Sequence, residues 1–126
     1  MATQIFVNLP VSDLERSIKF YAALGWAHNP EFTDDNASAI VISEEIYLMV
    51  VSEEFFATMT KGAARGTETV VALSVESKEK VDELADTALA SGGAVSSDPT
   101  EESFMYGRGF ADPDGHRFEL VHMFTA

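Results

Sequence analysis

Few side chains in this sequence could bind a metal ion or transfer a proton. The chain of 126 residues contains three histidines and no cysteine, which excludes disulfides, thiolate nucleophiles and thiolate metal sites. His116 follows a tight turn. His122 comes three residues after Glu119, so the two side chains would lie on opposite faces of a strand. Neither spacing resembles a metal-ligating pair, so we expect His28, His116 and His122 to be surface or edge residues.

Glu119 is the acidic residue whose surroundings most suggest chemistry. Its neighbours Phe118 and Leu120 are apolar and would point to the other face of a strand. A carboxylate in an apolar cavity can act as a general acid/base, or as an anionic anchor for a cationic ligand. It can equally be a carboxylate satisfied by hydrogen bonds or water, with no role in function. Both interpretations of Glu119 stay open on the sequence alone.

The first half of the chain predicts a strand, a helix and three more strands. Residues 4–11 alternate between apolar and other side chains, the period of a strand with one apolar face. Ser12 forms a capping box with Glu15, and Asp13 is an equally acceptable cap for a helix that Gly25 would end. Turn residues then separate three strands, expected at residues 27–32, 37–43 and 46–51.

The second half repeats this order. Residues 69–75 alternate, Ser77 can cap a helix, and Gly92 and Gly93 would end that helix. Three further strands are expected at residues 94–97, 104–111 and 116–123, with a solvated turn at residues 98–103. The sequence therefore predicts an α+β fold of two βαβββ modules: module one at residues 1–60, a linker at 61–67 and module two at 68–126.

Two segments resemble the motifs of a known family. Residues 11–21 read VSDLERSIKFY, and residues 110–120 read FADPDGHRFEL. They resemble the two module motifs of the vicinal oxygen chelate superfamily, which includes glyoxalases, bleomycin-resistance proteins and extradiol dioxygenases. The chain is also similar to bacterial lactoylglutathione-lyase-like proteins. The resemblance implies an incomplete barrel around a central cavity, frequent homodimers and, in the enzymes, a divalent metal held by the first and last strands of each module.

The resemblance assigns the metal-ligand positions to Phe6, Met49, Val70 and Glu119, with Leu48 in place of Met49 if the register shifts by one residue. Phenylalanine, valine and methionine lack the hard oxygen or nitrogen donors that such a metal needs. A catalytic site normally keeps about three protein ligands, and one carboxylate does not make a metal site. We therefore expect no cofactor; a divalent metal in a rebuilt site is the alternative.

The expected cavity is apolar and aromatic, with Trp26 and Phe110 among the residues of its walls. At least half of these wall residues are expected to be ordinary core residues instead. If the chain is an enzyme, Glu119 is its expected catalytic residue. The expected ligand-binding residues are Phe6, Asn8, Tyr47, Met49, Val70, Tyr106 and Arg108.

The charge and apolar content of the chain indicate which kinds of partner it can bind. The net charge of −13 disfavours binding to nucleic acid, although the simplest role of this acidity is to keep the protein soluble. No apolar run approaches the roughly 20 residues of a membrane helix, and the N-terminus carries no secretory signal, so a cytoplasmic location is the default.

Our leading hypothesis is a homodimeric, metal-independent protein that binds a small, partly apolar molecule. The alternative is a lyase or isomerase that uses a divergent metal site or Glu119. The apolar residues Phe55, Phe56 and Met59 are assigned to an interface or a lid.

Overall fold

A computed structural model describes residues 3–60 and 69–124, so the predicted linker at 61–67 lies outside the described residues. The chain divides into two compact units, residues 1–66 and 67–126, and each is described by itself. Among the described residues, no helix has the length and apolar character to cross a membrane.

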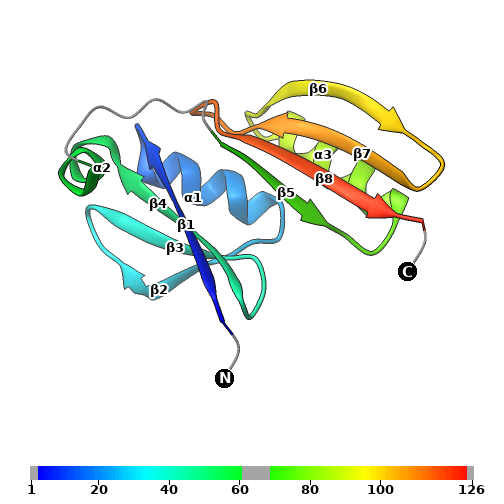
Figure 1. Cartoon of the computed structure of the whole chain (residues 1–126). Coiled ribbons are helices and arrows are strands. Elements are labelled where there is room, and N and C mark those ends of the chain that lie inside the picture. Colours follow the sequence, from blue (N-terminus) through cyan, green and yellow to red (C-terminus); the bar gives the residue numbers. More distant parts are fainter. Residues whose placement is uncertain (1–2, 61–68, 125–126) are drawn as a thin grey trace. The chain divides into compact units, whose positions relative to one another are not determined.

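Unit 1 contains a four-stranded sheet in the order β1-β4-β3-β2, with β1 and β4 parallel and the other pairs antiparallel. A second, short helix follows the last strand (Figure 1). Its elements are β1 (Ile5–Val11), α1 (Leu14–Ala23), β2 (His28–Thr33), β3 (Ala37–Val41), β4 (Ile46–Ser52) and α2 (Glu53–Thr60).

Unit 2 repeats the arrangement with the strand order β5-β8-β7-β6, in which β5 and β8 are parallel. Its elements are β5 (Val70–Ser74), α3 (Lys78–Ala90), β6 (Ala94–Glu101), β7 (Met105–Ala111) and β8 (Arg117–Met123). The predicted α+β fold with two βαβββ modules is therefore confirmed. Each sheet is open, and neither closes into a barrel by itself.

The helix ends follow the chemistry of their caps. Asp13 is the N-cap of α1, and its carboxylate accepts a hydrogen bond from the Arg16 backbone N–H at 3.1 Å. The Ser12 hydroxyl instead accepts from the Arg16 guanidinium, so of the two possible caps the structure selects Asp13. Ser77 caps α3 as predicted. Gly25, with a φ of 91°, supplies the left-handed residue just past α1.

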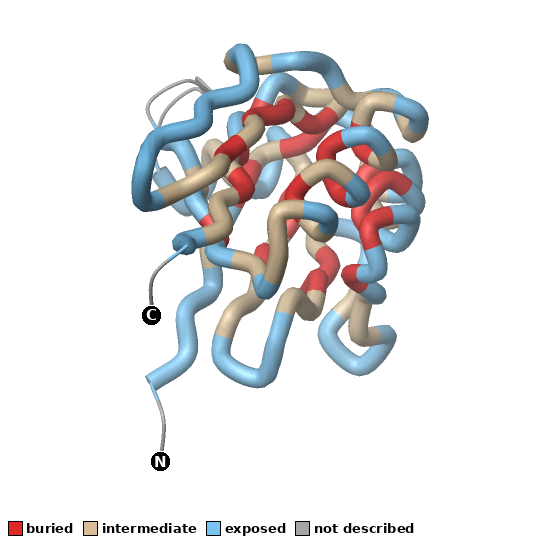
Figure 2. Tube along the Cα trace, turned by 90° about the vertical axis from the view of Figure 1, so that its right-hand side faces the viewer, coloured by how far each residue is buried: buried red, intermediate tan, exposed pale blue. Residues whose placement is uncertain are grey.

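In each unit one face of the sheet packs against a helix and forms the core (red in Figure 2). In unit 1 the buried strand residues Leu9, Val11, Leu48 and Val50 pack with Phe20 and Tyr21 of α1. In unit 2 the residues that form this layer are Leu73, Phe110, Phe118, Leu120, Val81, Leu84, Ala85 and Ala88. Because strand side chains alternate, the residues between these buried positions lie on the opposite face of each sheet, called here the open face.

Two predictions about aromatic and polar segments need correction. Trp26 and Phe110, expected in cavity walls, are core residues: Trp26 stacks on Tyr21, and Phe110 stacks on Phe118 with ring centroids 4.9 Å apart. The solvated turn expected at residues 98–103 is largely strand, because β6 continues to Glu101. The polar sequence and Pro99 are compatible with this strand, since β6 is an edge strand with an irregular register.

Candidate functional site

The open face of unit 1 carries the first two positions that the resemblance assigns to metal ligands. Phe6 pairs with Tyr47 across the parallel strands β1 and β4, and Asn8 pairs with Met49. Leu48 is completely buried on the core face, so Met49, and not Leu48, is the open-face residue of this strand. The register therefore brings together Phe6, Asn8, Tyr47 and Met49 on one face.

An aromatic pair dominates this face. The rings of Phe6 and Tyr47 are stacked, with centroids 4.6 Å apart and planes within 8° of parallel. Phe6 remains 47% exposed, so the aromatic pair is accessible to a flat apolar ligand. The Tyr47 hydroxyl donates to the Glu44 carbonyl oxygen at 3.0 Å and accepts from the Gln4 amide at 3.3 Å, which holds this ring at the end of the sheet.

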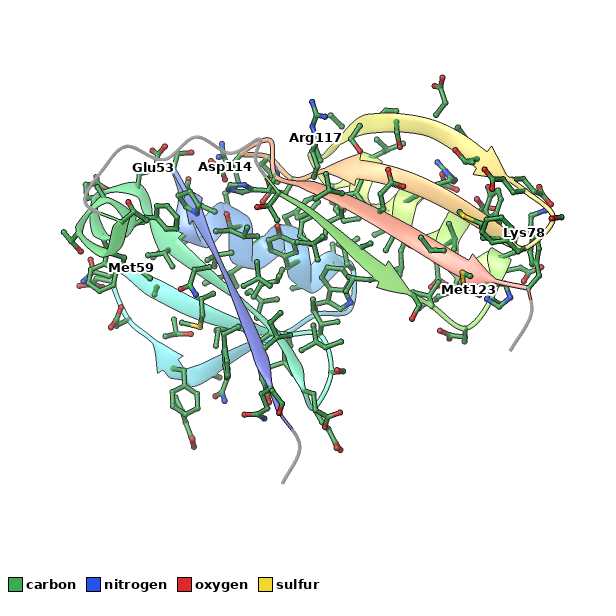
Figure 3. The ribbon with its side chains drawn as sticks, in the orientation of Figure 1. Glu53, Met59, Lys78, Asp114, Arg117 and Met123 are labelled. Atoms are coloured by element: carbon green, nitrogen blue, oxygen red, sulfur yellow. The ribbon has the colours of Figure 1, made fainter. Side chains whose placement is uncertain are left out.

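The open face of unit 2 carries the other two assigned positions. Val70 is half-exposed on the edge strand β5, and Glu119 lies on the neighbouring strand β8. Arg117 and Met123, labelled in Figure 3, mark the two ends of β8, and Glu119 lies between them. Glu119 is half-buried, and the Ser97 hydroxyl donates a hydrogen bond of 2.9 Å to its Oε1.

Gly109 leaves the space that this carboxylate occupies. It lies opposite Glu119 on β8 and opposite Ser97 on β6. A Cβ at position 109 would come within 3.0 Å of three oxygens, which belong to Ser96, Ser97 and Glu119. The register of β6 and β7 shifts between Val95 and Ser97, so Ser96 is the extra residue of a β-bulge. The bulge places both serine hydroxyls over Gly109, and one of them, Ser97, binds the carboxylate.

Tyr106 and Arg108, expected to contact a ligand beside Glu119, lie on the other face of the sheet. Tyr106 pairs with His122 and Arg108 with Leu120, so both side chains face α3. The Tyr106 hydroxyl donates to the Asp82 carboxylate at 2.6 Å. The Arg108 guanidinium bridges Asp82 at 3.0 Å and Asp86 at 2.9 Å. The reason is strand alternation: both residues share a face with the buried Phe110 and not with Glu119.

These contacts tie α3 to β7 electrostatically. The Tyr106 hydroxyl, and next the Arg108 guanidinium, hold the pKa of Asp82 below its ordinary value of 3.8. The same hydrogen bond to a carboxylate raises the pKa of Tyr106 above 10.0. Lys78 completes the network: its ammonium lies 4.9 Å above the Tyr106 ring and 3.0 Å from Glu101. The network links α3 to the core face of β7.

The histidines have separate local surroundings. His122 Nδ1 lies 3.0 Å from the Val75 carbonyl oxygen, on the face away from Glu119. His116 is buried and not at the surface as expected, because its backbone N–H donates to the buried Asp112 carboxylate and closes the turn before β8. His28 is half-buried on the edge strand β2.

The donor chemistry of the assigned positions does not fit a divalent metal ion. Phe6, Met49 and Val70 offer no oxygen or nitrogen from their side chains, which leaves the Glu119 carboxylate. Within residues 3–60 and 69–124, no group of three or more histidine, cysteine, aspartate or glutamate side chains is placed to hold a metal.

The sequence was then compared with known families and structures. Residues 4–120 match the model of the glyoxalase/bleomycin resistance protein/dioxygenase superfamily. The chain belongs to this superfamily. No curated protein matches the sequence.

Solved structures of the same superfamily fold support this assignment. A hypothetical protein from S. aureus is 32% identical, with a TM-score of 0.82 over 97% of this chain and 95% of that one. A superfamily enzyme from Burkholderia phytofirmans is 20% identical, with a TM-score of 0.84 over 98% and 100% of the two chains. TnmS3, an antibiotic binding protein from a Streptomyces species, is 21% identical, with a TM-score of 0.71 over 98% and 97%. The last two likenesses concern the fold alone.

Ser96, Ser97 and Gly109, which surround the Glu119 carboxylate, were not among the predicted site residues. A signal for them existed, since Gly107 and Gly109 alternate within one predicted strand, and a glycine inside a strand often marks a bulge or a close approach. The two serines carried no such signal, because the bulge depends on pairing between β6 and β7.

Proposed function

We propose that this chain is a glyoxalase/bleomycin-resistance-like protein that binds a small, partly apolar molecule on its open sheet faces without a catalytic metal. The observation that carries the proposal is the stacked Phe6–Tyr47 pair at a position where the enzymes of the superfamily place a metal ligand. An aromatic ring there removes a donor atom and adds a flat apolar surface of the kind that binding pockets use for orientation.

The remaining open-face residues suit the same role. Met49 and Val70 add flexible and branched apolar surface, and Asn8 adds an amide at the edge of the aromatic pair. The Asn8 amide N–H donates to the Phe6 carbonyl oxygen at 3.2 Å, so its side-chain oxygen stays available as an acceptor. TnmS3, an antibiotic binding protein, has a similar fold, and this analogy supports small-molecule binding by this chain.

A second candidate function rests on Glu119, the one residue at the assigned metal-ligand positions whose side chain could bind a metal. Glu119 could act as the general acid/base of a lactoylglutathione-lyase-like or other lyase or isomerase reaction. Its half-buried carboxylate, whose Oε2 has no hydrogen-bond partner among residues 3–60 and 69–124, favours this alternative over a purely structural role. Loss of turnover in Glu119→Gln, with the fold and ligand affinity intact, would support catalysis over binding alone.

Two features of the assembly belong to the same proposal. We propose a homodimer, supported by α2, where Phe55 and Met59 are 42% and 48% exposed (Figure 3 labels Glu53, the first residue of this helix, and Met59 near its end). We also propose a cytoplasmic location, with which the absence of cysteine is compatible. Size-exclusion chromatography of wild type and Phe55→Asp tests the dimer, and a monomeric wild type would contradict it.

A ligand screen tests binding. Metal-stripped protein is screened against aromatic small molecules by thermal shift, and each hit is measured by calorimetry with wild type, Phe6→Ala and Phe32→Ala. We expect Phe6→Ala to weaken binding by roughly tenfold or more, because a buried aromatic contact is lost. Phe32, a 65% exposed ring on the opposite edge strand, is the matched control and should leave affinity unchanged. Equal losses in both variants, or affinity that needs a metal, would contradict the proposal.

A further inference from the structure

Three oxygens converge over the backbone of Gly109 on the open face of unit 2. The hydroxyl oxygens of Ser96 and Ser97 and the Glu119 Oε1 all lie within 3.0 Å of the point that a Cβ at position 109 would occupy. They come from adjacent strands on either side of β7, so the cluster spans three strands of the sheet. We call Ser96, Ser97, Gly109 and Glu119 the oxygen cradle.

The hydrogen bonding within the cradle leaves it rich in acceptors. The Ser97 hydroxyl donates its hydrogen to Glu119 Oε1 at 2.9 Å, so towards a ligand the Ser97 oxygen acts as an acceptor. The second carboxylate oxygen, Oε2, carries the remainder of the negative charge. A carboxylate and two hydroxyls thus offer several acceptors on one patch of the open face. Ala72 on β5 and Val121 on β8, which lie beside Glu119, carry no hydrogen-bonding groups in their side chains.

Nearby positive charges do not neutralise this carboxylate. Arg108 lies on the opposite face of the sheet, where it bridges Asp82 and Asp86. Arg117 is on the open face two positions before Glu119, but no ion pair joins the two side chains in the part of the chain that the structure describes. A half-buried carboxylate without a cation attracts a positively charged group from a ligand, and the net charge of −13 favours its approach.

We propose that the oxygen cradle binds the protonated primary amine of a small molecule. This inference rests on the proposed metal-independent binding function and names the ligand class that the open face of unit 2 would take. A primary ammonium carries several N–H donors on one atom, which matches a carboxylate and two hydroxyls that lie together over the backbone of Gly109. A neutral alcohol would satisfy one acceptor, and a quaternary ammonium has no N–H to donate. One carboxylate with two neutral hydroxyls is also a weak ligand set for a divalent metal.

The experiment compares three probes that share a benzyl group. The full chain is labelled with ¹⁵N and titrated at neutral pH with benzylamine, benzyl alcohol and benzyltrimethylammonium. We expect saturable shifts of the Gly109 and Ser97 amide signals with benzylamine, and affinities at least roughly tenfold weaker for the other two probes, because charge-assisted hydrogen bonds are lost.

Two variants and one matched control locate the effect. Ser97→Ala removes an acceptor without adding bulk, and Gly109→Ala fills the point where the oxygens converge. Each should weaken benzylamine binding by roughly tenfold. Gly107→Ala is the control on the same face of β7, where a Cβ would meet the flexible end of Met105 at 3.0 Å, and it should bind benzylamine like wild type. If Gly109→Ala does not fold, Ser97→Ala decides alone.

The failures of the two proposals are distinguishable. Benzyl alcohol and benzylamine that bind equally, or benzylamine that leaves the Gly109 signal unmoved, would overturn the amine site while hits in the metal-free screen would still support small-molecule binding. Benzylamine binding that survives Ser97→Ala and Gly109→Ala unchanged would also overturn it. A metal requirement for every hit would overturn the proposed function itself.

Discussion

At the scale of single residues, the side-chain type at a few open-face positions determines what this fold can do. The family resemblance assigned Phe6, Met49, Val70 and Glu119 to the sheet faces away from the helices, and the register of both sheets places them there. Strand alternation could have placed Arg108 correctly, since it lies two residues before Phe110, but Phe110 had itself been assigned to a cavity wall. Residue type cannot separate a core phenylalanine from a pocket phenylalanine, because both are apolar and buried.

The caps of the first helix give a prediction at this scale. Asp13→Ala should reduce the free energy of unfolding by about 1 kcal/mol, because the first turn of α1 loses the acceptor for the Arg16 N–H. Ser12→Ala, whose hydroxyl binds the Arg16 side chain instead, should cost clearly less. Urea unfolding followed by the fluorescence of Trp26, the single tryptophan, measures both. A larger loss in Ser12→Ala would mean that Ser12 is the cap.

At the scale of elements, helices and central strands follow from sequence pattern, whereas edge strands depend on their partners. The apolar stripe of α3 and its Ser77 cap were both visible in the sequence. The second half of β6 was not, because residues 98–101 are polar and gain strand structure by pairing with β7. The cradle formed by Ser96 and Ser97 was missed for the same reason, since a bulge is a property of two strands together.

The network between α3 and β7 predicts a specific acid sensitivity. The pKa of Asp82 is lowered in the folded chain, so its contribution to stability is complete well above its ordinary value of 3.8 and is lost as the pH falls through the lower folded value. Asp82→Asn should therefore be less stable than wild type at neutral pH, by less than about 1 kcal/mol because this side chain is 43% exposed. The difference should shrink as the pH falls below 3.8 and through the lower folded pKa of Asp82.

Urea midpoints measured from neutral pH down to strongly acidic pH test this. Asp98→Asn is the control, because Asp98 is an exposed carboxylate on β6 outside the network. A stability gap between wild type and Asp82→Asn that stays constant across the pH range would show that the charge of Asp82 makes no contribution through Tyr106 and Arg108.

At the scale of the whole molecule, the repeat and the superfamily could be inferred from the sequence, but the chemistry could not. Membership rests on a match over residues 4–120, which covers both modules. Related folds carry different functions, so the open-face side chains, and not the fold, must decide between a metal enzyme and a binding protein. In this chain those side chains are an aromatic pair in unit 1 and an oxygen cradle in unit 2.

Metal content and metal titration of the purified chain test the central claim most directly. Elemental analysis is followed by calorimetry with zinc, nickel, manganese and iron(II), on wild type and on Glu119→Gln. We predict no stoichiometric metal in the purified protein and no saturable tight binding, because Phe6, Met49 and Val70 leave Glu119 as the single donor. One tightly bound metal per chain, lost in Glu119→Gln, would contradict the account and make a metal-dependent lyase the better interpretation.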